Sequence, residues 1–346
     1  MTPPRSNGAP VRSAAPPPFA IESIDLRTAD GWSLRADVVS PGDAGEIAGV
    51  AVLAHAAMAR RTEFSRPSGA GIASLLAGRG WRVVAFDFRG HGDSRPPPLA
   101  TLAARTAPFG YDDLVRRDLP AVCAFARELA DAGGGEGRPV IVIGHSLGGH
   151  TALAAQGSGS IAVDAVAGIA SAPPFLRDHE PSRARWMVKR AALASMLALA
   201  RRYGRFPARA LRLGSDDESL AACEDFDRFA GTGRWASRDG RVDYLEAIAK
   251  VRVPVLEVTS SGDRFECVPV CGERFVGCCA GPREVIRVTR ADAGGPAPSH
   301  MGLVTGGAIP RVWESIERWM RGVGRTTGAP LSKSGARPPP GRSSPD

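Results

Sequence analysis

Two spacings of apolar residues alternate along most of this chain. Residues 21–27 and 32–39 alternate apolar with polar side chains on either side of Ala29-Asp30-Gly31, which predicts a β-hairpin. Short apolar runs without that alternation are typical of strands buried on both faces. They predict further strands at residues 50–55, 81–88, 140–143, 163–171, 253–261 and 283–289.

Stretches with helical spacing lie between these runs, at residues 64–77, 112–130 and 309–320. Pro120 falls inside the second stretch and is expected to kink that helix. Strands that are joined through helices run parallel, and the helices cover both faces of the sheet. We therefore expect an α/β fold with a mostly parallel sheet.

Composition divides the chain into segments. Residues 1–18 and 325–346 are dense in Pro, Gly, Ser and Arg, and we expect disordered tails there because little apolar surface can be buried. The core is expected to comprise residues 19–172 and 251–324. The interruption at residues 173–250 is too long for a loop and looks helical. It predicts a lid over the C-terminal edge of the sheet, where open α/β sheets bind ligands.

The bulk numbers restrict the function classes. The 346 residues are 43% hydrophobic, enough for a sizeable core, and no apolar run approaches the roughly 18–20 residues that span a bilayer. No secretory signal is evident, so we expect a cytoplasmic protein. The net charge is +8, but only 6% of residues are aromatic and no recognition motif appears, so we expect no nucleic-acid partner. The six cysteines match no zinc spacing, and we expect reduced thiols and no metal.

A predicted strand-to-helix turn carries the first candidate chemistry. Residues 144–148 read GHSLG, which fits the nucleophile elbow G-x-S-x-G. Gly144 and Gly148 flank the serine because side chains there would crowd a sharp turn. Ser146 is therefore the candidate nucleophile, next to a helix N-terminus whose N–H groups can face an oxyanion.

A serine nucleophile needs a base, and the base needs an acid to orient it, in the chain order Ser, acid, His. Of six histidines, only His300 follows the last predicted strand, and we take it as the base. Asp263 lies just past the strand at 253–261, and we prefer it as the acid to Glu266 and Asp292. The alternatives are a surface histidine and a turn aspartate without a catalytic role.

The oxyanion hole requires two backbone donors. The N–H of Leu147, directly after the nucleophile, is expected to be the first. The second is expected in the loop that follows the strand at 50–55, where Ala57 is our choice and Met58 the alternative.

These motifs together resemble the α/β-hydrolase superfamily over about residues 21–321. VAFDFRGHGDS at 84–94 looks like the family's D-x-R-G-H-G-x-S turn, and GHSLGG at 144–149 is similar to the elbow of its lipase, esterase and serine-aminopeptidase-like branches. GDRFECV at 262–268 resembles the acid loop, and SHMG at 299–302 the histidine loop. With YDDL at 111–114, the chain looks most like uncharacterised bacterial predicted hydrolases.

The resemblance implies an α/β-hydrolase fold with a helical lid and a triad of Ser146, Asp263 and His300. One loop departs from the family. The usual oxyanion loop reads His-Gly-x, whereas this chain has His55-Ala56-Ala57. Because alanine does not take positive φ freely, we expect this loop to differ in shape.

The leading hypothesis is a serine hydrolase without metal or cofactor, acting on the ester, thioester or amide of a small-molecule acyl substrate. The alternatives are an acyltransferase that uses the same triad and a catalytically silent binding protein. Within the lid, residues 182–213 hold nine Lys and Arg and no acid. We favour a helix that covers the pocket with its arginines in water over one that contacts a lipid surface. The sequence leaves the oligomeric state open.

Overall fold

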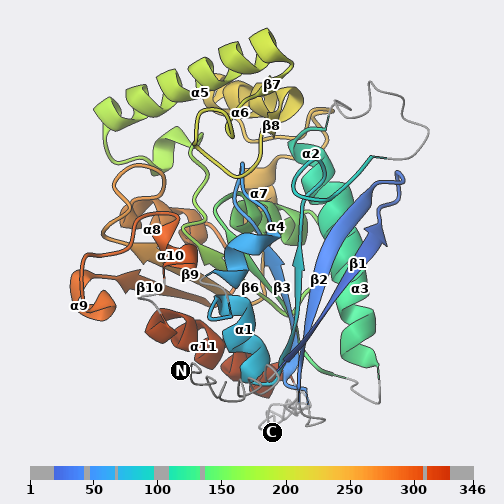
Figure 1. The fold of residues 1–346 in the computed structure, drawn as a ribbon. Coiled ribbons are helices and arrows are strands. Elements are labelled where there is room, and N and C mark those ends of the chain that lie inside the picture. Colours follow the sequence, from blue (N-terminus) through green and yellow to red (C-terminus); the bar gives the residue numbers. More distant parts are fainter. Residues whose placement is uncertain are drawn as a thin grey trace, which may run out of the picture.

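An eight-stranded sheet runs through the middle of the computed structural model, which describes residues 19–42, 47–66, 69–96, 109–132, 137–306 and 310–327 (Figure 1). The strand order is β1-β2-β4-β3-β5-β6-β9-β10. The strands are β1 (Phe19–Arg27), β2 (Ser33–Pro41), β3 (Gly49–Ala54), β4 (Trp81–Phe86), β5 (Val140–His145), β6 (Ala165–Ile169), β9 (Val255–Ser260) and β10 (Arg283–Val288). The predicted disordered tails, 1–18 and 325–346, lie outside the described residues apart from 325–327 in the last helix.

The predicted hairpin and the mostly parallel sheet are both confirmed. β1 pairs with β2 antiparallel, and β2 pairs antiparallel with β4, while the remaining neighbours run parallel. Strands β3, β5, β6 and β9 are buried at every position. Burial on both faces explains why these strands read as continuous apolar runs in the sequence.

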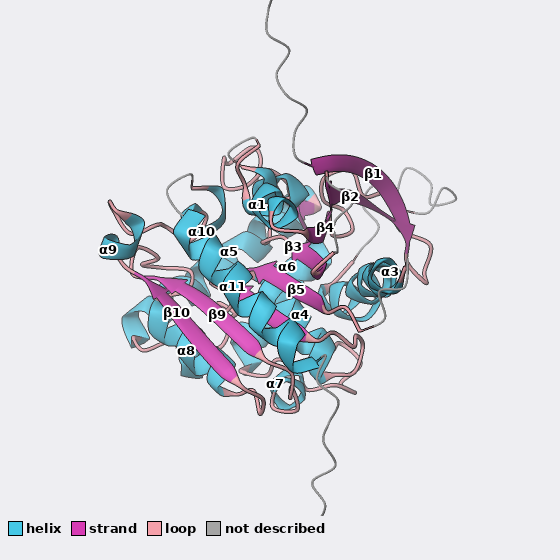
Figure 2. Cartoon of the chain, turned by 90° about the horizontal axis from the view of Figure 1, so that it is seen from below, coloured by secondary structure: helices cyan, strands magenta, loops and turns pink. Residues whose placement is uncertain are grey.

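Helices cover both faces of the sheet, with α1 and α11 on one side and α3 and α8 on the other (Figure 2). The helices of this layer and its loops are α1 (Ile72–Gly78), α2 (Tyr111–Asp113), α3 (Leu119–Asp131), α4 (Leu147–Gly157), α7 (Tyr244–Ile248), α8 (Pro269–Gly277), α9 (Arg290–Ala293), α10 (Gly302–Thr305) and α11 (Pro310–Thr327). Because every crossover helix returns the chain to the same edge, the carboxyl ends of the parallel strands meet at one rim.

The helix predicted over residues 64–77 is confirmed only from Ile72 onward, and its first half is wrong. A 3₁₀ turn (Arg61–Ser65) ends just after the start of the predicted range, and α1 begins only at Ile72. Between them the chain doubles back so closely that a Cβ on Gly71 would lie 2.3 Å from the carbonyl oxygen of Phe64. Phe64 and α1 therefore bury apolar side chains from two different elements, and their combined spacing imitates one helix.

The predicted helix over 112–130 exists, and Pro120 widens it instead of breaking it. A π-helical turn (Leu114–Asp118) precedes α3, in which Pro120 is the second residue. Proline lacks the N–H that the carbonyl oxygen of Arg116 would accept in an α-helix, and the proline ring crowds that carbonyl group. The wider turn relieves this clash. The turn directs buried Asp118 at the backbone N–H and side chain of Arg89, 3.0 and 2.8 Å away.

The predicted lid range, 173–250, forms most of the upper part of the molecule (Figure 1). It contains a 3₁₀ turn (Arg177–His179), α5 (Arg183–Tyr203), β7 (Arg205–Phe206), β8 (Glu218–Ser219) and α6 (Leu220–Thr232). Helix α5 packs on α6, and we call residues 177–232 the cap. The end of the predicted range is not part of the cap, because α7 packs on α4 in the helical layer that covers the sheet.

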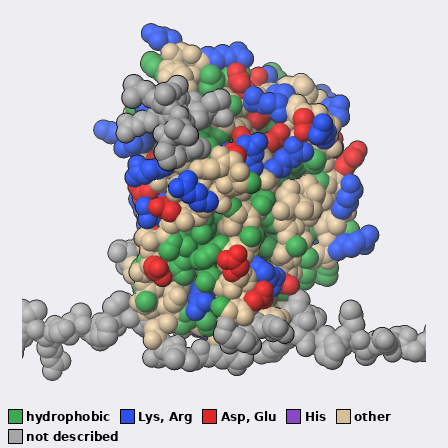
Figure 3. Space-filling model, turned by 90° about the vertical axis from the view of Figure 1, so that its right-hand side faces the viewer, with side chains coloured by type: hydrophobic (Ala, Val, Ile, Leu, Met, Phe, Trp, Pro, Cys, Tyr) green, Lys and Arg blue, Asp and Glu red, His purple; other side chains and the backbone are tan. Residues whose placement is uncertain are grey.

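Charge on the cap is partly neutralised within it. Arg190 pairs with Asp227, and Arg205 with Asp217 at 3.1 Å. The outer side of α5 also exposes Met187 and Val188, at 70% and 56%. Figure 3 shows acidic and basic side chains interspersed on one face of the molecule, without a continuous basic surface there. None of the described helices combines the length and hydropathy that crossing a bilayer requires.

Candidate active site

The strand-to-helix turn holds Ser146 in a strained backbone conformation. β5 ends at His145, α4 begins at Leu147, and Ser146 between them has φ +51° and ψ −111°. A non-glycine residue at positive φ is costly, and such strain persists only where surrounding contacts enforce it. The Ser146 N–H donates to the carbonyl of Ile169 at 2.9 Å, which ties the turn to β6.

The two flanking glycines are required by close approach. A Cβ on Gly144 would lie 2.3 Å from the backbone of Gly148, and one on Gly148 would lie 2.0 Å from the carbonyl oxygen of Ala54 in β3. The crowding predicted from the sequence is therefore present, and it locks the elbow between two strands.

Replacing Gly148 by alanine is expected to lower the free energy of unfolding by about 3 kcal/mol, because the new methyl group meets backbone that cannot move aside. Gly78→Ala is the matched control. Gly78 ends α1, and nothing lies within 4 Å of a Cβ placed there, so its stability should be unchanged or raised by up to about 1 kcal/mol. Urea unfolding of both variants measures the difference, and equal midpoints would contradict the close contact.

Asp263 and His300 meet directly. The His300 Nδ1 lies 2.6 Å from Asp263 Oδ2, and both side chains are almost completely buried. The two loops are joined as well: Ser260 Oγ donates to the carbonyl of Pro298 at 2.6 Å, and Gly262 approaches the backbone of Ala297 closely. The loop after β9 thus fixes the position of the loop that carries His300.

Backbone donors keep Asp263 ionised. Its carboxylate accepts the N–H groups of Phe265, Glu266 and Cys267 at 3.3, 3.0 and 3.1 Å. Burial raises the pKa of Asp263, but His300 and these N–H groups outweigh burial and leave the pKa below its ordinary value. An ionised Asp263 assigns the proton to Nδ1 of His300, which leaves Nε2 with a free lone pair.

His300 lies beside the nucleophile turn. Its ring centroid is 4.9 Å from that of His145, the residue before Ser146. The structure thus brings Asp263, His300 and the Ser146 elbow together at the rim where the parallel strands end.

The rival carboxylates serve other purposes. The carboxylate of Asp292 caps α9 by accepting the N–H and hydroxyl of Thr289 at 2.8 and 2.7 Å. Glu257 is buried inside β9 and accepts the hydroxyl of Ser171, and burial raises its pKa to about 7. Glu266 is exposed and contributes its backbone N–H to Asp263.

Asp263, Glu266 and His300 also form a possible cation-binding group, because one ligand atom from each lies within 4.8 Å of the others. Asp263 Oδ2 and His300 Nδ1 are already hydrogen-bonded to each other, and a protonated Nδ1 has no lone pair for a cation. The donor set fits an acid–base pair better than a metal site.

The loop after β3 contains the predicted oxyanion donors. His55 is buried, donates from Nδ1 to the carbonyl of Ala56 at 2.7 Å, and accepts the Phe88 N–H on Nε2 at 3.0 Å. Burial and the neighbouring His91 lower the pKa of His55 to about 3, so its ring is neutral. The positive φ in this loop falls on Met58, at +58°.

The backbone N–H groups of this loop point to different partners. The Ala56 N–H donates to Glu63 Oε1 at 3.1 Å, and the Met58 N–H faces the carboxylate of Glu218. Within the described residues, the N–H groups of Ala57 and Leu147 have no acceptor. These two are the donors that the sequence favours.

Glu63 is a site residue that the sequence analysis missed. It is buried, and besides Ala56 its Oε1 lies 3.2 Å from Nδ1 of His145, so it links the loop after β3 to the elbow. No local motif marks it, because it stands between the loop after β3 and the segment predicted as helix from residue 64.

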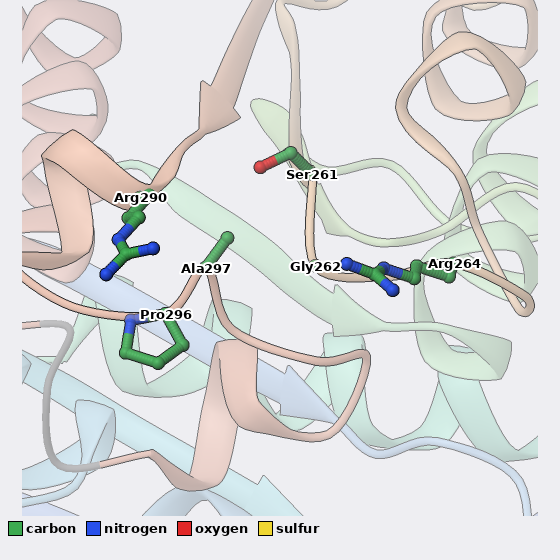
Figure 4. Close-up of a pocket in the computed structure, with 6 residues that line it drawn as sticks. All are labelled: Ser261, Gly262, Arg264, Arg290, Pro296 and Ala297. Carbon is green, nitrogen blue, oxygen red and sulfur yellow. The ribbon is translucent and has the colours of Figure 1, made fainter.

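A pocket lies on the outer side of the loops that carry Asp263 and His300 (Figure 4). Its lining is Ser261, Gly262, Arg264, Arg290, Pro296 and Ala297. Ser146 is not among these residues, so we do not take this pocket for the place where the serine would meet a substrate.

Comparison with known proteins supports the fold that these motifs resemble. The model of the family described as "Alpha/beta hydrolase family" matches residues 51–323. The chain belongs to the alpha/beta hydrolase family. The fold is accordingly the alpha/beta hydrolase fold, with its mostly parallel eight-stranded sheet. A comparison with curated protein sequences found no match.

Solved structures of the same fold are distant in sequence. Est1E from Butyrivibrio proteoclasticus with bound ferulic acid superposes with a TM-score of 0.55 at 14% identity, covering 86% of this chain and 97% of its own. The esterase EaEST from Exiguobacterium antarcticum gives 0.54 at 15% identity, covering 87% and 100%. The complex of DcsB with its substrate analogue gives 0.57 at 13% identity, covering 88% and 99%. At these identities the likeness concerns the fold alone.

Proposed function

We propose that this protein is a serine hydrolase that cleaves a carboxylic ester, or a thioester or amide, through an acyl-enzyme on Ser146. The observation that carries the proposal is the 2.6 Å hydrogen bond between buried Asp263 and His300, placed next to a strained serine elbow. An aspartate, a histidine and a serine in this relation serve to activate a nucleophile.

The proposed reaction begins with proton transfer from Ser146 Oγ to His300 Nε2 as Oγ bonds to the carbonyl carbon. The resulting oxyanion accepts the N–H groups of Leu147 and Ala57, and Asp263 stabilises the imidazolium that has formed. His300 then gives its proton to the leaving alcohol, thiol or amine, whose bond to the carbonyl carbon breaks. In the second half, His300 deprotonates water, the hydroxide attacks the acyl carbon, and the acid leaves as Ser146 regains its proton.

The cap is proposed to act as a lid over this site, and the substrate to be a small acyl compound. The structures of Est1E with bound ferulic acid and of DcsB with its substrate analogue support a small-molecule substrate.

A fluorophosphonate probe tests the proposal, because it reacts with activated serines. We expect labelling of the wild-type protein and a single modified peptide that contains Ser146. Absence of labelling would favour a catalytically silent binding protein. Product analysis with competing alcohols and amines then separates hydrolysis from acyl transfer, since a transferase makes new esters or amides in preference to free acid.

A further inference from the structure

The loop after β3 contacts a segment of the cap that lies far away in sequence. We call residues 214–219, between β7 and α6, the cap segment. The Asp216 N–H donates to the carbonyl of Met58 at 3.0 Å. Gly214 comes so close that a Cβ there would lie 2.3 Å from the Met58 carbonyl oxygen.

An ion pair strengthens this contact. Arg60 binds both carboxylate oxygens of Asp216, with Nε–Oδ2 and Nη2–Oδ1 distances of 2.7 Å, and donates to the carbonyl of Ser215 at 2.9 Å. Asp216 is 7% exposed and also accepts the N–H of Gly92 at 3.2 Å. Bidentate pairs of this kind fix orientation as well as distance.

Glu218 contacts the same loop from the other side. Its buried carboxylate lies 3.3 Å from Nε2 of buried His91 and faces the Met58 N–H. Burial lowers the pKa of His91, but Glu218 and Asp216 outweigh burial and raise the pKa to about 8, so the pair is ionised at neutral pH. Met58 is thus held at its carbonyl by the Asp216 N–H, and the Glu218 carboxylate lies on the side of the Met58 N–H.

These contacts explain how the loop keeps its shape without a glycine. Met58 has φ +58°, and residues 55–59 include no glycine that would adopt this conformation at low cost. A strained residue of this kind persists when its surroundings determine its position. The cap segment supplies that constraint at the Met58 carbonyl, through the Asp216 N–H and the close approach of Gly214.

We propose that Asp216 and Glu218 are positioning residues: by fixing Met58 in the left-handed conformation, they aim the adjacent Ala57 N–H at the oxyanion. This inference rests on the proposed serine hydrolase function. It makes the cap a structural part of the oxyanion hole as well as a cover. A donor that is misplaced by about 1 Å can cost on the order of 100-fold in rate, so the effect is measurable.

Asp216→Asn tests the proposal, with Asp217→Asn as its matched control. Asp217 is the next residue, but it pairs with Arg205 and with the backbone N–H of Arg209, away from the loop. With a p-nitrophenyl ester we expect Asp216→Asn to lower kcat about 10-fold to 100-fold with little change in KM. We expect Asp217→Asn to stay within about twofold of wild type, since surface ion pairs contribute little.

The same substitution made in the Met58→Gly protein distinguishes a positioning role of Asp216 from a general loss of stability. In Met58→Gly the left-handed conformation costs little, so adding Asp216→Asn should lower kcat by only about threefold. Equal losses in both backgrounds would overturn the proposal, as would equal kcat for Asp216→Asn and Asp217→Asn. If Asp216→Asn does not fold, Arg60→Lys decides instead: it keeps the charge but loses the bidentate contact, and unchanged kcat would overturn the proposal. A wild-type protein without hydrolytic activity would refute the proposed function itself.

Discussion

Replacing Ser146 by alanine is expected to lower kcat for ester hydrolysis by about 10⁶-fold. The proposed chemistry forms its only covalent bond through Ser146 Oγ, and no other group at the elbow offers a nucleophile in its place. The residual acceleration would come from the Leu147 and Ala57 N–H groups and from substrate binding. The measurement is hydrolysis of p-nitrophenyl esters of increasing acyl length, which also shows how long an acyl chain the site accepts.

The control for Ser146→Ala is its stability. Serine already occupies φ +51° at this position, and alanine has nearly the same backbone preferences, so the melting temperature should be unchanged within a few degrees. Fluorophosphonate labelling should disappear together with activity. Labelling that persists at the wild-type level would mean that another serine reacts, and the acyl-enzyme would then not form on Ser146.

The strands were the most predictable part of the fold. β3 and β5 are short, almost entirely apolar, and buried on both faces, so their local composition is enough to identify them as strands. The segment at 64–77 was not predictable in this way. Its apolar spacing arises from a 3₁₀ turn and a separate helix that bury side chains in the same core, and the reversal at Gly71 is fixed by tertiary contact.

The candidate site residues differ in the same way. Ser146, Asp263 and His300 could be proposed from the sequence because each stands in a local motif whose order along the chain is set by the sheet topology. Glu63, Asp216 and Glu218 carry no such motif. Asp216 meets Arg60 across 156 positions of sequence, and Glu218 meets the loop through space. The absence of a glycine after His55 signalled an altered loop, but only the coordinates show that the strain falls on Met58 and that the cap contacts it.

Asparagine in place of Asp263 is expected to lower kcat by about 10⁴-fold. With its oxygen at the Oδ1 position, the amide can still accept the N–H groups of Phe265 and Glu266, and only the Cys267 N–H loses its acceptor, so the loop should keep most of its shape. What changes is the tautomer of His300. An amide NH₂ facing Nδ1 favours the ring with its proton on Nε2, and such a ring cannot take the proton of Ser146. Steady-state hydrolysis measures this effect, and a cooperative melting transition shows that the variant is folded.

Glu266→Gln is the matched control, because Glu266 is the other carboxylate close to His300. Its side chain is exposed and holds no hydrogen bond within the described residues, so kcat should stay within about threefold of wild type. A larger loss in Glu266→Gln than in Asp263→Asn would transfer the acid role to Glu266. The two variants together also test whether a cation binds to Asp263, Glu266 and His300. A metal held by both carboxylates would make both substitutions lower kcat strongly, whereas with an acid–base pair only the substitution of Asp263 does so.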